Sequence, residues 1–86
     1  MEKKVIIKNE SGIHARPAAL LVKKASEFEC KVEIDFNGKK VNAKSIMGIM
    51  SLGASKGSEI TVITEGSDEE KAANEVANII ESGFGE

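Results

Sequence analysis

The chain has 86 residues, of which 41% are hydrophobic and 30% are charged, and its formal net charge is −2. Length and composition are those of one small globular domain, so we expect residues 1–86 to form a single domain. Its apolar runs fall well short of the ~20 residues that cross a bilayer, and its negative charge argues against non-specific binding to nucleic acid. We therefore expect no membrane insertion and no direct nucleic-acid binding.

Hydrophobic periodicity predicts four strands and three helices. Segments rich in β-branched residues, or with alternating polar and apolar residues, indicate strands, while apolar residues spaced by three and four indicate helices. In chain order we expect a strand over 3–8, a helix over 17–27, strands over 31–36 and 39–43, a helix over 46–52, a strand over 59–64 and a helix over 68–82. Four strands with one apolar face and three amphipathic helices predict an α+β fold of the βαββαβα type, an open-faced sandwich with the helices on one face.

Capping and turn residues mark the ends of these elements. Pro17 suits the first turn of a helix, and Asn37–Gly38 predicts a two-residue hairpin turn. Ser45 is expected to cap the short helix, and Ser67–Glu70 reads as a capping box for the last one. Gly83 is then expected to end that helix.

The most informative segment joins the first strand to the first helix, and it holds the single histidine and the single proline of the chain. His14 comes just before a helix N-terminus, where unpaired amides and the helix dipole favour an anion. Positions 14–16 carry no conventional capping side chain, so these amides remain available to phosphate oxygens. Arg16 adds a guanidinium that binds such oxygens in a forked geometry. Since imidazole has a pKa of about 6.5 and is mostly neutral at pH 7, His14 could accept and release a phosphoryl group.

A second interpretation of the same residues stays open at this point. A histidine before a helix is often a plain surface residue, and Arg16 would then be an ordinary solvent-facing charge. Two rival functions also remain. A nucleic-acid-binding domain would need stacking aromatic residues on its sheet, and an autonomous histidine hydrolase would need an acid–base partner, for which Glu10 is the only carboxylate near His14 in sequence.

The short helix predicted after Ser45 carries more apolar residues than one face can bury. Ile46, Ile49 and Met50 share a face, while Met47 and Leu52 fall elsewhere. These residues are either core or an apolar docking patch with basic neighbours. Cys30, the only cysteine, is expected to be a buried small hydrophobe, and a lone cysteine fits a cytoplasmic location. With one histidine and one cysteine, we expect no metal site and no cofactor.

Two long motifs resemble those of the HPr family, the histidine-containing phosphocarriers of the bacterial sugar phosphotransferase system. Residues 12–18 (GIHARPA) match the active-site signature of that family, and residues 44–52 (KSIMGIMSL) resemble its second signature in the Gram-positive form. One departure is Ala19, where many members carry Thr. The resemblance implies a sheet in the strand order first, fourth, second, third, with the helices on one face.

The resemblance also implies the function. His14 would be phosphorylated at Nδ1 by enzyme I with phosphoenolpyruvate as the source, Arg16 would steady the phosphate, and IIA domains of sugar permeases would receive it. The protein would be a carrier between enzymes, not an enzyme itself, and a monomer. Ser45 would be phosphorylated by HPr kinase/phosphorylase, and the modified form could engage a catabolite-control transcription regulator. The expected docking residues are Leu20, Lys23, Lys44, Ile46, Met47, Met50 and Leu52.

Overall fold

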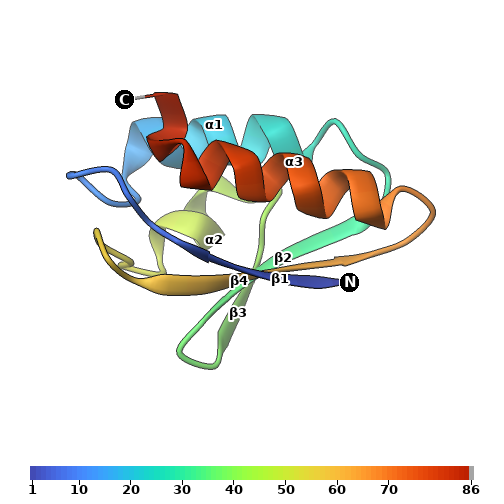
Figure 1. Ribbon diagram of the computed structural model, residues 1–86, viewed down its shortest axis with the longest axis horizontal. Helices are drawn as coiled ribbons and strands as arrows, with labels where there is room; N and C mark the ends of the chain where they lie inside the picture. Colours follow the sequence, from blue (N-terminus) through green and yellow to red (C-terminus); the bar gives the residue numbers. More distant parts are fainter. Residues whose placement is uncertain (86) are drawn as a thin grey trace.

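Four strands form one antiparallel sheet in the computed structural model, which describes residues 1–85. The order across the sheet is β1-β4-β2-β3, as the resemblance implied (Figure 1). The outer strand β1 pairs with β4 from Glu2 opposite Ile63 to Ile6 opposite Glu59, and β2 lies between β4 and β3. The strands are β1 (Glu2–Ile6), β2 (Lys31–Phe36), β3 (Lys39–Asn42) and β4 (Glu59–Glu65).

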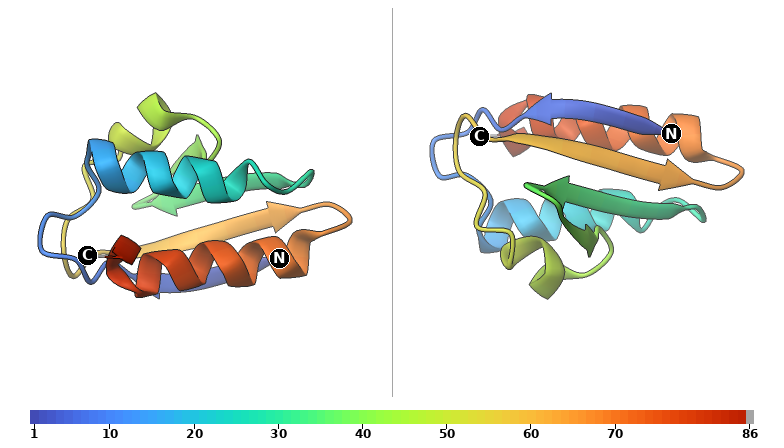
Figure 2. Two further views of the ribbon diagram at one scale, coloured as in Figure 1. Left: turned by 90° about the horizontal axis from the view of Figure 1, so that it is seen from above. Right: turned by 90° about the horizontal axis from the view of Figure 1, so that it is seen from below.

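Three helices cover one face of the sheet. Figure 2 shows α1 and α3 side by side above the sheet, and the view from below shows the opposite face without helices. The short α2 packs against α1 and β3 at one side. The helices are α1 (Ala15–Ala25), α2 (Ile46–Met50) and α3 (Glu69–Glu81), followed by the 3₁₀ turn η1 (Gly83–Gly85). The α+β open-faced sandwich with a four-stranded antiparallel sheet is confirmed.

The core lies between the sheet and the helices. Alternate residues of β2 and β4 point to the helices and are almost fully buried, while Glu33 and Thr61 between them are partly exposed. Period-2 alternation on a half-buried sheet has this consequence. Buried side chains from all three helices complete the core, and its largest members include Leu21, Ile34, Ile49, Ile60, Val62, Val76 and Ile80.

The predicted elements are correct in kind and order, with shifted ends. Helix α1 begins at Ala15 and not at Pro17, which is the third residue of the helix. The hairpin turn forms as predicted, with positive φ at both Asn37 and Gly38. Strand β1 ends at Ile6, because Ile7 bonds instead to the loop before β4: Ile7 N–H donates to Ser58 O at 2.9 Å.

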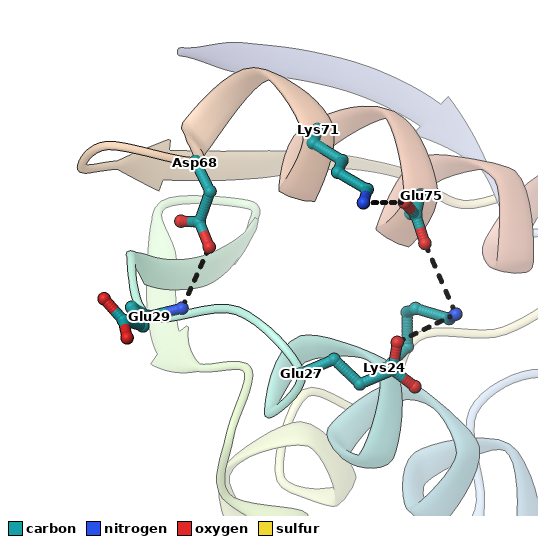
Figure 3. A network of polar contacts seen from close by, with 6 residues as sticks. All are labelled: Lys24, Glu27, Glu29, Asp68, Lys71 and Glu75. Atoms are coloured by element: carbon teal, nitrogen blue, oxygen red, sulfur yellow. Dashed lines mark hydrogen bonds and ion pairs between the residues drawn. The ribbon is translucent and has the colours of Figure 1, made fainter.

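The predicted capping box at residues 67–70 is wrong. The N-cap of α3 is Asp68, and its side chain makes no capping hydrogen bond. Its carboxylate instead accepts a hydrogen bond from the backbone N–H of Glu29 at 3.0 Å (Figure 3). It also accepts one from the backbone N–H of Cys30 at 3.0 Å. Asp68 therefore ties the connection between α1 and β2 to the start of α3. Sequence spacing could not reveal this, because the partners are 38 and 39 residues away.

Candidate functional site

His14 is the N-cap residue of α1 and is exposed to solvent. Its backbone is extended, with φ −132° and ψ −165°, and its carbonyl oxygen accepts from Ala18 N–H at 2.8 Å. The His14 side chain makes no capping hydrogen bond, and the first turn of α1 contains no acidic residue. The positive end of the α1 dipole is thus not neutralised by the side chain of its own cap or by a carboxylate in its own first turn.

The loop before His14 is held by buried contacts. Asn9 is only 5% exposed, and its Nδ2 donates to Gly12 O at 2.7 Å. Ile13 N–H donates to Ala54 O at 3.1 Å, which ties the loop to the segment before β4. Gly12 has φ +66°, and a Cβ there would lie 2.8 Å from Ala54 O. Only glycine fits this place, so the sequence fixes where His14 stands relative to the neighbouring loop.

The imidazole ring of His14 has a defined neighbour. Its Nε2 lies 2.9 Å from Ser11 Oγ, and Ser11 Oγ is in turn 3.4 Å from Asn9 Nδ2. Arg16 is the second residue of α1 and is exposed, so both side chains named by the motif stand at the same helix end. Sequence reasoning overlooked Asn9 and Ser11. The one feature that could have indicated them is their position, since both are polar and lie between the apolar first strand and Gly12, close to His14 in the sequence.

Ser45 caps α2 as predicted. Its Oγ accepts from Gly48 N–H at 3.1 Å, and its extended backbone has φ −117° and ψ 117°. The side chain is partly exposed. Ser45 therefore caps α2, and its side chain is still accessible to solvent.

The residues expected to meet partners divide into exposed and buried ones. Met47 is 83% exposed, and Ile46 and Met50 are 45% and 44% exposed, so α2 presents an apolar surface. Of the others, Lys23 is exposed, while Leu20 and Lys44 are half-buried. Because α1 and α2 pack together, this surface lies beside the helix that His14 begins.

Leu52 does not lie on this surface. It is 7% exposed and belongs to the core cluster, so the expectation that it faces a partner is wrong. The physical reason is the end of α2 at Met50. Leu52 N–H donates to Ile49 O at 3.2 Å, and this turn points the Leu52 side chain inward.

The contacts of Glu10 bear on the alternative function of a histidine hydrolase. Glu10 accepts a hydrogen bond from Lys56 Nζ at 2.5 Å, and this contact lowers the pKa of the Glu10 carboxyl. A carboxylate held by a lysine with a lowered pKa is poorly suited to general acid–base work at neutral pH, which weakens the hydrolase alternative.

Cys30 is buried as expected. Burial, together with the neighbouring Asp68, raises the pKa of its thiol to about 11, so the thiol stays protonated and unreactive at neutral pH. Within residues 1–85, the structure contains no cluster of three or more histidine, cysteine or acidic side chains able to hold a metal ion. Over the same part of the chain, none of the helices has the length and apolar character needed to span a membrane.

A family model described as "PTS HPr component phosphorylation site" matches residues 1–82. The chain belongs to the HPr family. Among curated proteins, HPr-like protein Crh of Halalkalibacterium halodurans is 52% identical over 81 residues, which cover 94% of this chain and 96% of that protein. HPr-family membership confirms the resemblance read from the two motifs and makes the chain a phosphocarrier-family protein of the phosphotransferase system.

Solved HPr-family structures agree with the fold. HPr-C-His from Thermoanaerobacter tengcongensis is 52% identical and superposes with a TM-score of 0.95, covering all of this chain and 97% of that one. Crh of Bacillus subtilis is 46% identical with a TM-score of 0.79, covering 94% and 93% of the two chains, and is described as a swapped dimer. The relatives thus include both HPr proteins and HPr-like Crh proteins.

Proposed function

We propose that this protein is a phosphoryl carrier. His14 accepts a phosphoryl group at Nδ1 from phosphorylated enzyme I and passes it to IIA domains of sugar permeases. One observation carries the proposal: an exposed imidazole stands as the N-cap of α1, with no carboxylate in the first turn and with Arg16 two residues on.

The chemistry follows from that placement. Phosphoryl transfer depends mainly on positioning and on stabilising charge spread over the phosphate oxygens. The positive end of α1 and the Arg16 guanidinium both supply such stabilisation at His14. The family resemblance assigns the phosphate to Nδ1, and Ser11 Oγ lies 2.9 Å from the other ring nitrogen, Nε2.

Labelling tests the proposal directly. The protein is incubated with enzyme I and labelled phosphoenolpyruvate, and we expect one phosphate per chain that is labile in acid and stable in base. His14→Ala should abolish the label, while the matched control Ser45→Ala should keep it. An unlabelled protein, under conditions in which enzyme I labels another HPr, would overturn the proposal.

We propose that Ser45 regulates the carrier through phosphorylation by HPr kinase/phosphorylase. Its Oγ is the cap of α2, and a phosphate at a helix N-terminus is compatible with the helix dipole. The added charge of about −2 would stand beside the exposed apolar residues of α2 and repel an acidic partner. We expect Ser45→Asp to slow labelling of His14, with Ser45→Asn as the uncharged control. Equal rates in the two variants would contradict this role.

We propose that partners dock on the surface of α1 and α2 around His14. It combines adaptable methionines with lysines, which suits several acidic partners. Met47→Ala should raise the KM for enzyme I more than it lowers kcat, because Met47 is exposed and lies apart from the reacting atoms. The docking residues that we retain are Leu20, Lys23, Lys44, Ile46, Met47 and Met50.

A second candidate function comes from the Crh relatives, one of which is described as a catabolite repression protein. In that role Ser45 phosphorylation and a catabolite-control transcription regulator would matter, and His14 labelling would not. The presence of His14 with Arg16 at the start of α1, where the first turn contains no acidic residue, favours the carrier. The labelling experiment separates the two functions, since a protein with the Crh-type role alone would need no phosphate on His14.

The remaining assignments accompany the carrier proposal. Residues 1–86, of which Glu86 lies outside the described part, would act as one domain in the cytoplasm, without a cofactor and without an active site for a substrate of its own. The buried free thiol of Cys30 suits a reducing compartment. We propose a monomer, and a mass in solution near twice the 9.2 kDa of the chain would instead match the dimer described for the Bacillus subtilis Crh.

A further inference from the structure

The contacts of Asn9, Ser11 and His14 form a short relay in the loop before α1. Gly12 O can only accept a hydrogen bond, so the Asn9 atom 2.7 Å from it must be the amide nitrogen. That nitrogen has a second hydrogen, and Ser11 Oγ lies 3.4 Å away to receive it. Because Asn9 is 5% exposed, the orientation of its amide is held by the fold.

The last contact of the relay concerns the ring. Ser11 Oγ and His14 Nε2 are 2.9 Å apart, and either atom could in principle donate. Ser11 Oγ has two lone pairs, so an oxygen that accepts from Asn9 can also accept from a proton on Nε2. A proton on Nε2 then leaves the lone pair on Nδ1.

We propose that Ser11 and Asn9 are positioning residues that hold neutral His14 in the Nε2–H tautomer. Ser11 Oγ accepts from Nε2–H, and Asn9 orients Ser11. The functional benefit of this tautomer rests on the proposed carrier function, because in phosphoryl transfer the Nδ1 lone pair forms the new bond to phosphorus. The bond between phosphorus and the donor breaks as the Nδ1–P bond forms, the donor leaves with the old electron pair, and the Nε2 proton stays in place.

The contact between Ser11 Oγ and Nε2 also favours the second transfer, in which phosphorylated His14 passes its phosphoryl group to the acceptor. A ring that carries the phosphoryl group on Nδ1 and a proton on Nε2 is a better leaving group than the unprotonated ring. Ser11 Oγ, as an acceptor, stabilises that proton in both halves of the cycle. A hydroxyl that donated to Nε2 would do the opposite and would place the proton on the nitrogen that must react.

The tautomer can be measured without any partner protein. Long-range proton–nitrogen correlation spectra of the histidine-labelled full chain, at about pH 8.5 where an ordinary imidazole is neutral, show which ring nitrogen carries the proton. We expect the wild type to be mostly Nε2–H. Ser11→Ala should lower the ratio of Nε2–H to Nδ1–H by roughly three- to tenfold, the size of one neutral hydrogen bond.

Matched variants complete the test. Ser11→Thr keeps a hydroxyl and should restore the wild-type ratio, and Ser26→Ala, a serine at the far end of α1, should leave it unchanged. Ser11 is exposed, so its variants should fold, and they decide the proposal without the buried Asn9. A wild type that is mostly Nδ1–H, or a ratio that Ser11→Ala does not change, would overturn the proposal.

Labelling rates separate this inference from the carrier function. Ser11→Ala should slow labelling of His14 by roughly three- to tenfold, and Ser11→Thr should restore the rate. If the tautomer behaves as expected and the wild type is never labelled, the carrier function fails and the relay stands. If labelling proceeds and the tautomer is independent of Ser11, the relay alone is wrong.

Discussion

The N-termini of α1 and α3 use the same physical property in opposite ways. The first turn of α3 contains Glu69 and Glu70, and Asp68 is its N-cap. The first turn of α1 contains no acidic residue and begins with His14 and Arg16. Both helices have unpaired amides and a positive dipole end at this point. In α3 the first turn supplies carboxylates of the protein itself, whereas the first turn of α1 contains no acidic residue.

The difference shows that the N-terminus of α3 stabilises the fold, whereas the N-terminus of α1 is suited to binding an anion. The carboxylates of α3 make structural contacts: Asp68 holds Glu29 and Cys30, and Glu69 Oε1 accepts from Gly66 N–H at 3.2 Å. Further along, Lys24 bridges α1 to Glu75 of α3 (Figure 3). The positive end of α1 has no carboxylate of its own first turn to satisfy it, and this is the condition for binding an external anion.

Removing the charge at α1 should have the largest effect. Arg16→Ala is expected to slow phosphorylation of His14 by about 100-fold, because a forked, charge-assisted contact to the phosphate is lost. The rate of label transfer from enzyme I measures this. Lys71→Ala removes an exposed cation from α3 and serves as the control, with a rate close to wild type. A rate for Arg16→Ala within twofold of wild type would show that the guanidinium has no part in transfer.

A pair of glycine variants, one before α1 and one before α3, tests whether the loops at these two helix N-termini affect phosphoryl transfer independently. A Cβ at Gly12 would lie 2.8 Å from Ala54 O, and a Cβ at Gly66 would lie 2.7 Å from the Cβ of Cys30, with positive φ at both. We expect Gly12→Ala and Gly66→Ala each to lower the free energy of unfolding by about 2 kcal/mol, through strain and displaced neighbours. Urea unfolding measures this loss.

The two glycine variants should differ in transfer. Gly12→Ala displaces the loop that carries His14, so the folded protein should also accept phosphate several-fold more slowly. Gly66→Ala should transfer at the wild-type rate wherever it is folded. Equal transfer rates in the two variants would mean that the position of this loop does not limit the reaction.

Giving α1 the acidic first turn of α3 should move stability and function in opposite directions. Ala15→Glu places a carboxylate at the first residue of α1, which should stabilise the fold by about 0.5 kcal/mol. The same charge should repel the incoming phosphate and slow labelling about tenfold. Ala15→Gln is the uncharged control and should show neither effect. A charged variant that transfers as fast as the Gln variant would contradict the role of α1 as an anion site.

The smallest expected effect concerns acid stability at the α3 end. The Cys30 thiol and the backbone N–H groups of Glu29 and Cys30 hold the pKa of Asp68 below its usual range. A carboxyl whose pKa is lowered by folding stabilises the protein above its unfolded pKa of about 4, and this stabilisation is lost as the pH falls through the lower folded value. The advantage of wild type over Asp68→Asn should therefore be greatest near neutral pH and shrink in acid. Thermal unfolding from about pH 7 to about pH 3 measures it, and an advantage independent of pH would disprove the assignment.

Local patterns predicted the elements because they report local physics. Alternation in 31–36, the Asn37–Gly38 turn and the Ser45 cap depend on neighbours close in sequence, and all three are present as predicted. The motif around His14 also predicted an exposed histidine at a helix start, and the structure places it there. The strand order followed only from the family resemblance, since periodicity says which face a residue takes and not which strand it pairs with.

The sequence alone therefore determined the element order, the open-faced sandwich and the helix end at which His14 and Arg16 stand. The tertiary structure decided what those residues meet. It buried Leu52 and brought Ala54 against Gly12. It also placed Asp68 within hydrogen-bond distance of Glu29 and Cys30, which are distant in the sequence. The reason is that caps, turns and periodicity act over a few residues, whereas burial and long-range hydrogen bonds depend on how the sheet and helices close around one core.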